Sequence, residues 1–130
     1  MNKNNIIYWT TTSIIALMMG FSGVAYLTNP DIKVEFAKTG FPDFFRVELA
    51  VAKILGVLVL VLPMIPTKIK DAAYAGFGIV LISAAVAHAG IGDDATKVST
   101  PLVVMGILAV SYIYLHKKVA VLYTGVWTLK

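Results

Sequence analysis

The chain has 130 residues, of which 58% are hydrophobic and 14% are charged, and its formal net charge is +4. A typical soluble domain carries about 25% charged residues, so this composition favours an integral membrane protein that lipid solvates. The chain has no cysteine, which excludes disulfides and thiolate metal sites, and its two histidines are too few for a histidine-rich centre; we predict no metal site. The basic residues lie at the ends of apolar runs, a pattern of membrane topology and not of nucleic-acid binding.

Residues 6–27 form the first predicted transmembrane helix. They contain no charged residue and reach the ~20 residues that a bilayer requires. Tyr8 and Trp9 at one end and Tyr26 at the other match the aromatic belts of a spanning helix. One lysine precedes the run, as in a signal peptide, but the run exceeds the usual ~7–15 apolar residues of such a segment. We therefore expect a retained first helix.

Residues 28–42 connect the first span to the second and begin with a helix-stop signal, Asn-Pro-Asp at 29–31. Two interpretations stay open for the rest of this segment. It is either a short amphipathic helix on the membrane surface, with Ile32 and Phe36 on its apolar side, or a solvated loop. Gly40 ends the segment in both cases.

The second predicted span covers residues 43–62 and the third covers residues 72–89. Pro42 suits the first turn of the second span, and two prolines after Leu62 stop it. The third span is rich in alanine and glycine, which let helices approach one another closely in lipid. We expect this third span to be a central helix.

The fourth predicted span covers residues 101–115. Ser99 and Thr100 before Pro101 are typical of a helix cap followed by proline at the first helical position. Residues 119–130 are too few to cross a bilayer, and we expect this tail to lie along the interface.

Four spans with short connections predict an all-α, integral membrane, antiparallel four-helix bundle that forms a single domain over residues 1–130. The lysine bias gives its orientation. Six lysines fall on the side of both termini, and three fall on the other side: Lys3, Lys68, Lys70, Lys117, Lys118 and Lys130 against Lys33, Lys38 and Lys97. We predict that both termini are cytoplasmic.

The second span is unusual because it contains Arg46, Glu48 and Lys53. A charge inside a bilayer costs roughly 2.5–3.5 kcal/mol on insertion scales, so such residues pair, reach water or have a function. Arg46 and Lys53 are seven residues apart and share a helix face, whereas Glu48 lies about 160° from Arg46 and cannot pair with it on one helix. The topology places His88 at a depth similar to that of Arg46. We therefore predict an outward-facing polar pocket with four candidate binding residues: Arg46, Glu48, Lys53 and His88.

Simpler interpretations stay open for three of these residues. Arg46 can extend to the outer headgroups, Glu48 can favour the positive N-terminus of its helix, and His88 can be an interfacial, hydrogen-bonded histidine. Lys53 lies about 15 Å along the helix from Asp43, which is too deep for an easy escape to water.

Three motifs resemble the DoxX-like family of small four-helix membrane proteins. They are G-F-P-x-x-F-R-x-E-L-x-x-A-K-I-L-G at 40–56, A-Y-A-G-F-G at 73–78 and A-H-x-x-x-G-D at 87–93, and the resemblance extends over residues 8–118. It implies a four-helix integral membrane protein in which the four candidate residues stand at the family's charged positions. It also implies several functions, because namesake relatives are membrane subunits associated with thiosulfate:quinone oxidoreduction, others belong to oxidative-stress complexes, and a distant vertebrate branch resembles receptor-assembly chaperones.

Two hypotheses fit these features, and whether the chain is an enzyme stays open. In the first, the chain is a redox subunit whose polar pocket holds a quinone or another small molecule, with His88 or Glu48 relaying protons. In the second, it is a non-enzymatic scaffold or assembly factor. Transport is a third interpretation, but no inverted repeat supports it. The expected partners are the lipid bilayer, other membrane subunits or further copies of the chain, in a bacterial cytoplasmic membrane.

Overall fold

The computed structural model describes the backbone of residues 2–128 and the side chains of residues 2–120. Within these limits the chain is helical between short turns. The helices are α1 (Lys3–Thr28), α2 (Pro30–Ala37), α3 (Asp43–Val61), α4 (Thr67–Gly90) and α5 (Ala95–Thr128). The predicted all-α class is therefore confirmed for the described part of the chain.

Three of the described helices are long and apolar enough to cross a bilayer: α1, α4 and the Ala95–Ala120 part of α5. They present large apolar side chains to their surroundings, and Phe21 of α1 is 78% exposed. Extensive apolar exposure of this kind marks a surface that contacts lipid. α3 has 19 residues, and Arg46, Glu48 and Lys53 lie within it, whereas each of the other three helices contains an apolar stretch of 18 residues with at most two charged side chains. Length and composition thus indicate an integral membrane protein.

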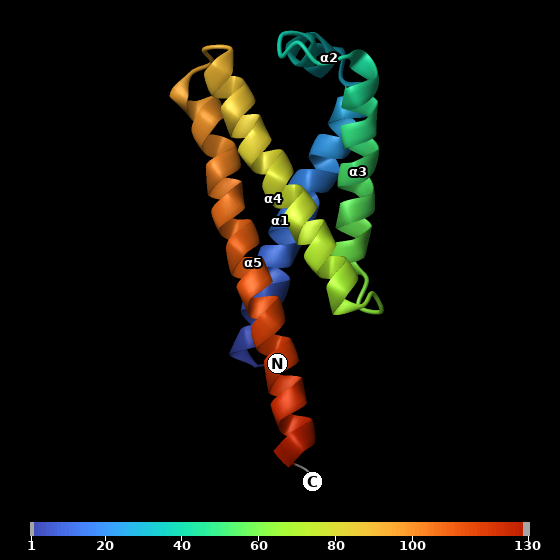
Figure 1. Cartoon of the computed structure of the whole chain (residues 1–130), viewed down its shortest axis with the longest axis vertical. Coiled ribbons are helices and arrows are strands. Elements are labelled where there is room, and N and C mark those ends of the chain that lie inside the picture. The colour runs from blue at the N-terminus through green and yellow to red at the C-terminus, as the bar shows by residue number, and fades with distance from the viewer. Residues whose placement is uncertain (1, 129–130) are drawn as a thin grey trace.

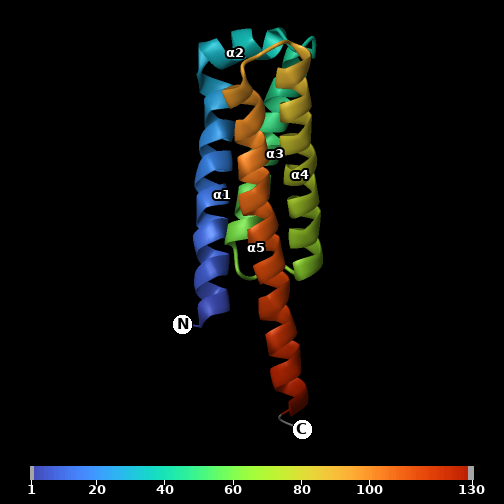
Figure 2. The same cartoon turned by 90° about the vertical axis from the view of Figure 1, so that its left-hand side faces the viewer.

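The four long helices alternate in direction along the chain (Figures 1 and 2). α1 packs against α3 and α5, and α4 packs against the same two helices. Figure 1 shows the α1–α3 pair and the α4–α5 pair together at one half of the molecule and diverging toward the other. α2 lies across the diverging end, as Figure 2 shows, and we refer to it as the α2 end.

The connection from α1 to α3 contains a short helix, so the helical interpretation of residues 28–42 is confirmed. Asn29 ends α1 and caps α2, because its side-chain oxygen accepts the N–H of Asp31 at 2.9 Å. Pro30 occupies the first turn of α2, where a missing N–H costs little. Gly40 then takes a positive φ of 84°, which allows the chain to turn into α3.

The fifth helix does not begin at Pro101, as the sequence pattern predicts. It begins at Ala95, because the Asp94 carboxylate accepts the N–H of Lys97 at 3.1 Å and caps the helix more than a turn earlier. Thr100 is not a cap; its hydroxyl donates to the carbonyl of Thr96 at 2.7 Å. Pro101 therefore lies inside α5, a position that spanning helices tolerate more readily than soluble ones.

Residues 119–128, most of the predicted interfacial tail, continue α5 as a helix that projects past the other helices (Figure 2). Residues 129 and 130 lie outside the described part of the chain. The interfacial position of this tail stays a prediction.

A buried network of hydroxyl groups joins α1, α4 and α5. The Thr12 and Ser111 hydroxyls are 2.7 Å apart, and the Tyr74 hydroxyl lies 2.6 Å from Ser111. Hydrogen bonds of this kind hold membrane helices together where no hydrophobic effect acts between them. The apolar core packs around the network and includes Tyr8, Ile15, Leu60, Phe77, Leu81 and Leu108. The network fixes the register of the three helices.

Candidate functional site

Lys53 lies near the middle of α3, with its ammonium group buried against α1. The residue is 5% exposed. Its Nζ donates to the Ser22 hydroxyl at 2.9 Å and lies 3.7 Å from the centroid of the Tyr26 ring. Ser22 and Tyr26 are four residues apart, so one face of α1 presents both groups. No carboxylate pairs with Lys53 among the described side chains, and its charge is solvated by a hydroxyl and an aromatic face.

Arg46 lies two turns before Lys53 on α3 and also faces α1. Its guanidinium donates to the Asp43 carboxylate, with Nε 3.0 Å from Oδ1, and to the main-chain carbonyl of Tyr26. This carbonyl lacks its usual helical donor, because the residue four positions later is Pro30, which has no N–H. Arg46 thus has a carboxylate partner, and it holds the end of α1 where the Tyr26 ring meets Lys53.

Glu48 does not join this group. It is exposed on α3, and it makes no hydrogen bond or ion pair to another described side chain. Helical phase explains the result, since a residue about 160° from Arg46 points away from α1 when Arg46 points toward it.

His88, in the last turn of α4, pairs with a residue of the connection that follows. Its Nδ1 lies 2.6 Å from Oδ2 of Asp93. This hydrogen bond lowers the pKa of Asp93, and the nearby charge of Lys97 acts in the same direction. A folded-state pKa below the unfolded one means that the ionised carboxylate contributes stability above the unfolded pKa of Asp93. This contribution is lost as the pH falls through the folded pKa. The pair is therefore intact at neutral pH.

The structure brings two of the four predicted residues together, and they meet at Tyr26. Arg46 binds the carbonyl of this residue, and Lys53 lies over its ring. We name Ser22, Tyr26, Asp43, Arg46 and Lys53 the α1–α3 polar cluster. The pairing of Ser22 with Lys53 was not predicted, and its sequence signal is the four-residue spacing from Ser22 to Tyr26. Figure 1 shows that the end of α4, which carries His88, diverges from the end of α3, which carries Arg46.

The sequence interpretation missed a second buried cation, Lys70 of α4, which it counted as a loop lysine. Its Nζ donates to the carbonyls of Val59, Leu60 and Leu62, at 2.9, 2.9 and 3.0 Å. Pro63 is the sequence feature that could have predicted this contact. It has no N–H, so the Val59 carbonyl lacks its helical donor. Lys70 therefore caps the end of α3 from the neighbouring helix.

Among the described residues, no group of three or more histidine, aspartate or glutamate side chains is arranged to hold a metal ion. The α1–α3 polar cluster offers cationic and hydroxyl donors instead. Such donors suit a ligand that presents oxygen acceptors.

A sequence profile of the DoxX-like family matches residues 10–111. The chain belongs to the DoxX-like family. The match includes α1 from its second turn, all of α2, α3 and α4, and α5 as far as Ser111. It therefore contains the whole α1–α3 polar cluster of this DoxX-like protein. No curated protein and no solved structure shows significant similarity to the chain.

Proposed function

We propose that this DoxX-like protein is an antiparallel four-helix membrane bundle that binds a small molecule at the α1–α3 polar cluster and serves as a quinone-linked redox subunit. α3 is the fourth span in this proposal. Its 19 residues extend about 28 Å at ~1.5 Å per residue, close to the thickness of a bilayer core. Both termini lie in the cytoplasm of a bacterial cell, in accord with the lysine bias.

The buried ammonium of Lys53 carries this proposal. Arg46 has Asp43 as its counter-ion, but among the described side chains Lys53 has only the Ser22 hydroxyl and the Tyr26 ring. An intramembrane cation without a counter-ion is costly, and a bound oxygen acceptor would lower that cost. Arg46 has a positioning role, because it fixes the Tyr26 end of α1.

A quinone carbonyl or a small oxyanion fits this chemistry. The Lys53 ammonium would donate a hydrogen bond to the ligand oxygen in place of the Ser22 hydroxyl. A quinone oxygen gains negative charge as the ring is reduced, and a fixed ammonium stabilises that charge. A proton relay through His88 or Glu48 does not belong to this site. His88 pairs with Asp93, and Glu48 is exposed on the side of α3 that points away from α1.

Lys53→Met is expected to lower thiosulfate- or thiol-dependent quinone reduction about tenfold or more, since a lost charged hydrogen bond costs ~1.5–3 kcal/mol and ~1.4 kcal/mol is tenfold in rate. The assay uses membranes that contain the full chain and its partner subunits. Lys38→Met is the matched control, because Lys38 is exposed at the α2 end and its one ion pair among the described side chains is with Glu35, at 4.0 Å. Lys53→Arg is expected to restore part of the rate. Equal rates in wild type and Lys53→Met, or no activity in either, would contradict the proposal.

Glu48 favours a second function, that of a scaffold or assembly factor. Phe44, Val51 and Leu55 lie on the same face of α3 as Glu48 and are 70%, 47% and 57% exposed. A carboxylate on an apolar, exposed face of a membrane helix is costly unless a partner supplies a basic side chain. The partner in this proposal is a second membrane protein with a lysine or arginine at the matching depth.

A photo-crosslinker at position 51 tests this second function in native membranes. We expect an adduct with another membrane protein, mapped by mass spectrometry to a segment that contains a basic residue, and we expect Glu48→Gln to abolish it. A crosslinker at position 82 of α4 is the control, since Ile82 is 50% exposed and its neighbours one turn away, Ile79 and Val86, are apolar and exposed. If the only adduct is with a second copy of the chain, the Glu48 face mediates homo-oligomerisation and the scaffold function is contradicted. Lipid adducts alone would exclude both.

A further inference from the structure

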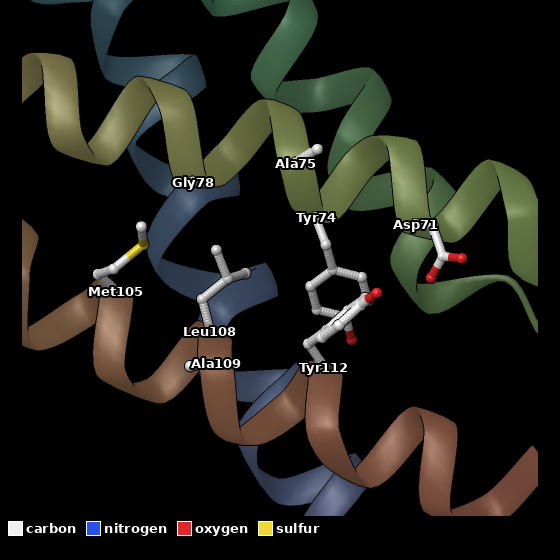
Figure 3. A pocket seen from close by; sticks show the side chains of 8 residues that line it. All are labelled: Asp71, Tyr74, Ala75, Gly78, Met105, Leu108, Ala109 and Tyr112. Atoms are coloured by element: carbon white, nitrogen blue, oxygen red, sulfur yellow. The ribbon is translucent and has the colours of Figure 1, made fainter.

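A groove of about 340 Å³ lies between α4 and α5 on the surface of the molecule. Figure 3 shows its shape: Tyr74 of α4 and Tyr112 of α5 reach toward one another, Asp71 lies at one end and Met105 at the other. None of the four predicted site residues lines it. The groove is separate from the α1–α3 polar cluster, so an inference from it goes beyond the proposed function.

The end of the groove at Asp71 is built from a carboxylate and two aromatic rings. Asp71 Oδ1 lies 2.8 Å from Nε2 of His116, and the Asp71 side chain keeps 37% of its surface exposed. The rings of Tyr74 and Tyr112 meet edge to face with their centroids 5.2 Å apart. The Tyr74 hydroxyl is fixed from behind by Ser111, at 2.6 Å. These contacts hold the polar groups in place before a ligand arrives.

The groove is negative in a region rich in lysine. Of the eight residues that line it, Asp71 is the one with a charged side chain. Three of the nearby lysines are directed elsewhere: Lys70 caps α3, Lys117 lies over the Tyr114 ring, and Lys118 lies over the Tyr8 ring. Lys68, one turn before Asp71 on α4, is exposed and forms no ion pair with it. The carboxylate therefore faces the groove without a competing ammonium group in its lining.

The other end of the groove is apolar. Gly78, Met105 and Leu108 form it, and Gly78 has no side chain to fill the space. α4 and the first part of α5 are both long and apolar enough to span a bilayer, so the mouth between them opens toward lipid. A ligand that enters here must itself be lipid-soluble.

We propose that the α4–α5 groove binds a lipophilic organic cation. Asp71 is the counter-ion, the exposed ring of Tyr112 beside the buried Tyr74 stabilises the positive charge, and the apolar end takes the hydrophobic body of the ligand. His116 is a positioning residue, because its hydrogen bond holds the carboxylate at the end of the groove. An anion of the same size is disfavoured, since it would meet the Asp71 carboxylate and, among the described residues, no lysine or arginine lines the groove.

The test uses tetraphenylphosphonium as the cation and tetraphenylborate as the anion of the same shape. The full chain is placed in phosphatidylcholine nanodiscs, and bound label is measured by equilibrium dialysis against empty nanodiscs. We expect saturable binding of tetraphenylphosphonium that unlabelled tetraphenylphosphonium displaces and tetraphenylborate does not. Absence of saturable binding, or equal saturable binding of the anion, would overturn the proposal.

Three substitutions locate the site. Asp71→Asn is expected to weaken binding about tenfold, and Tyr112→Leu is expected to weaken it several-fold, whereas Tyr112→Phe keeps the ring and binds as wild type. Asp31→Asn is the matched control, because Asp31 is an exposed aspartate at the α2 end. If Asp71→Asn does not fold, the affinities of Tyr112→Leu and Tyr112→Phe decide whether the cation binds in the α4–α5 groove. Wild-type affinity in Asp71→Asn, or equal affinities in the two Tyr112 variants, would place the cation elsewhere and overturn the proposal.

Discussion

Gly56→Ala is expected to destabilise the protein by about 1–3 kcal/mol, the usual cost of an overpacked core. A Cβ atom at Gly56 would lie 2.5 Å from Cζ of Phe77 and 3.0 Å from Cε2 of the same ring. Phe77 is 3% exposed and belongs to the core between the helices, so its ring cannot move without displacing its neighbours. The substitution therefore forces α3 away from α4 where the two helices meet.

SDS titration of the protein in mixed micelles, followed by tryptophan fluorescence, measures this change in unfolding free energy. Gly76→Ala is the matched control, because Gly76 is exposed on α4 and a Cβ there would meet no atom within 4 Å. An alanine inside a helix gains roughly 0.5–1 kcal/mol over glycine, so the control is expected to be neutral or stabilising. The double variant Gly56→Ala, Phe77→Leu is expected to lose less unfolding free energy than the two single variants lose together. A stable Gly56→Ala protein would show that α3 and α4 do not pack closely at this point.

Lys70→Met is expected to cost about 2–3 kcal/mol, because hydrogen bonds to a charged donor contribute ~1.5–3 kcal/mol and the Leu60 carbonyl lies at a buried position. Methionine keeps the length of the side chain but donates no hydrogen bond. The carbonyls of Val59, Leu60 and Leu62 would lose their shared donor, and the negative end of the α3 dipole would lose its cation.

The same SDS titration checks the prediction, with Lys68→Met as the control. Lys68 lies two residues earlier in the first turn of α4 and is exposed, so its loss removes the same charge without uncapping α3. Lys70→Arg is expected to fall between wild type and Lys70→Met. If Lys68→Met and Lys70→Met are equally stable, the cap contributes nothing and the buried position of Lys70 needs another explanation.

Helical phase predicted part of the candidate site. A seven-residue spacing places Arg46 and Lys53 on one face of α3, and both residues do face α1. The same spacing argument separates Glu48 from Arg46, and Glu48 lies outside the cluster. Spacing on one helix carries no information about which other helix packs against it. The depth of Tyr26 makes it a candidate neighbour, but this spacing does not predict that both cations contact it.

Depth in the membrane predicted the surroundings of His88 less well. His88 was expected near Arg46 because the third predicted span ends on the side where the second begins. Depth fixes only the position along the membrane normal and does not say which groups are neighbours. The chain reversal after α4 places Asp93 Oδ2 2.6 Å from Nδ1 of His88, so the histidine pairs with Asp93 and not with Arg46. Local signals also compete at Pro101, where a cap-and-proline pattern predicts a helix start. The Asp94 carboxylate caps the helix earlier and overrides that pattern.

The pairing of prolines with cations bears on the order in which the helices assemble. Pro30 and Pro63 each free a main-chain carbonyl, and the cation that binds it is close in sequence: Arg46 is 20 residues from Tyr26, and Lys70 is 11 residues from Val59. The hydroxyl bond between Thr12 and Ser111 joins residues 99 positions apart. The two proline-linked contacts can therefore form as soon as α3 and then α4 have been synthesised. The first three long helices can reach their relative register while α5 is still being synthesised, and the hydroxyl network then closes last.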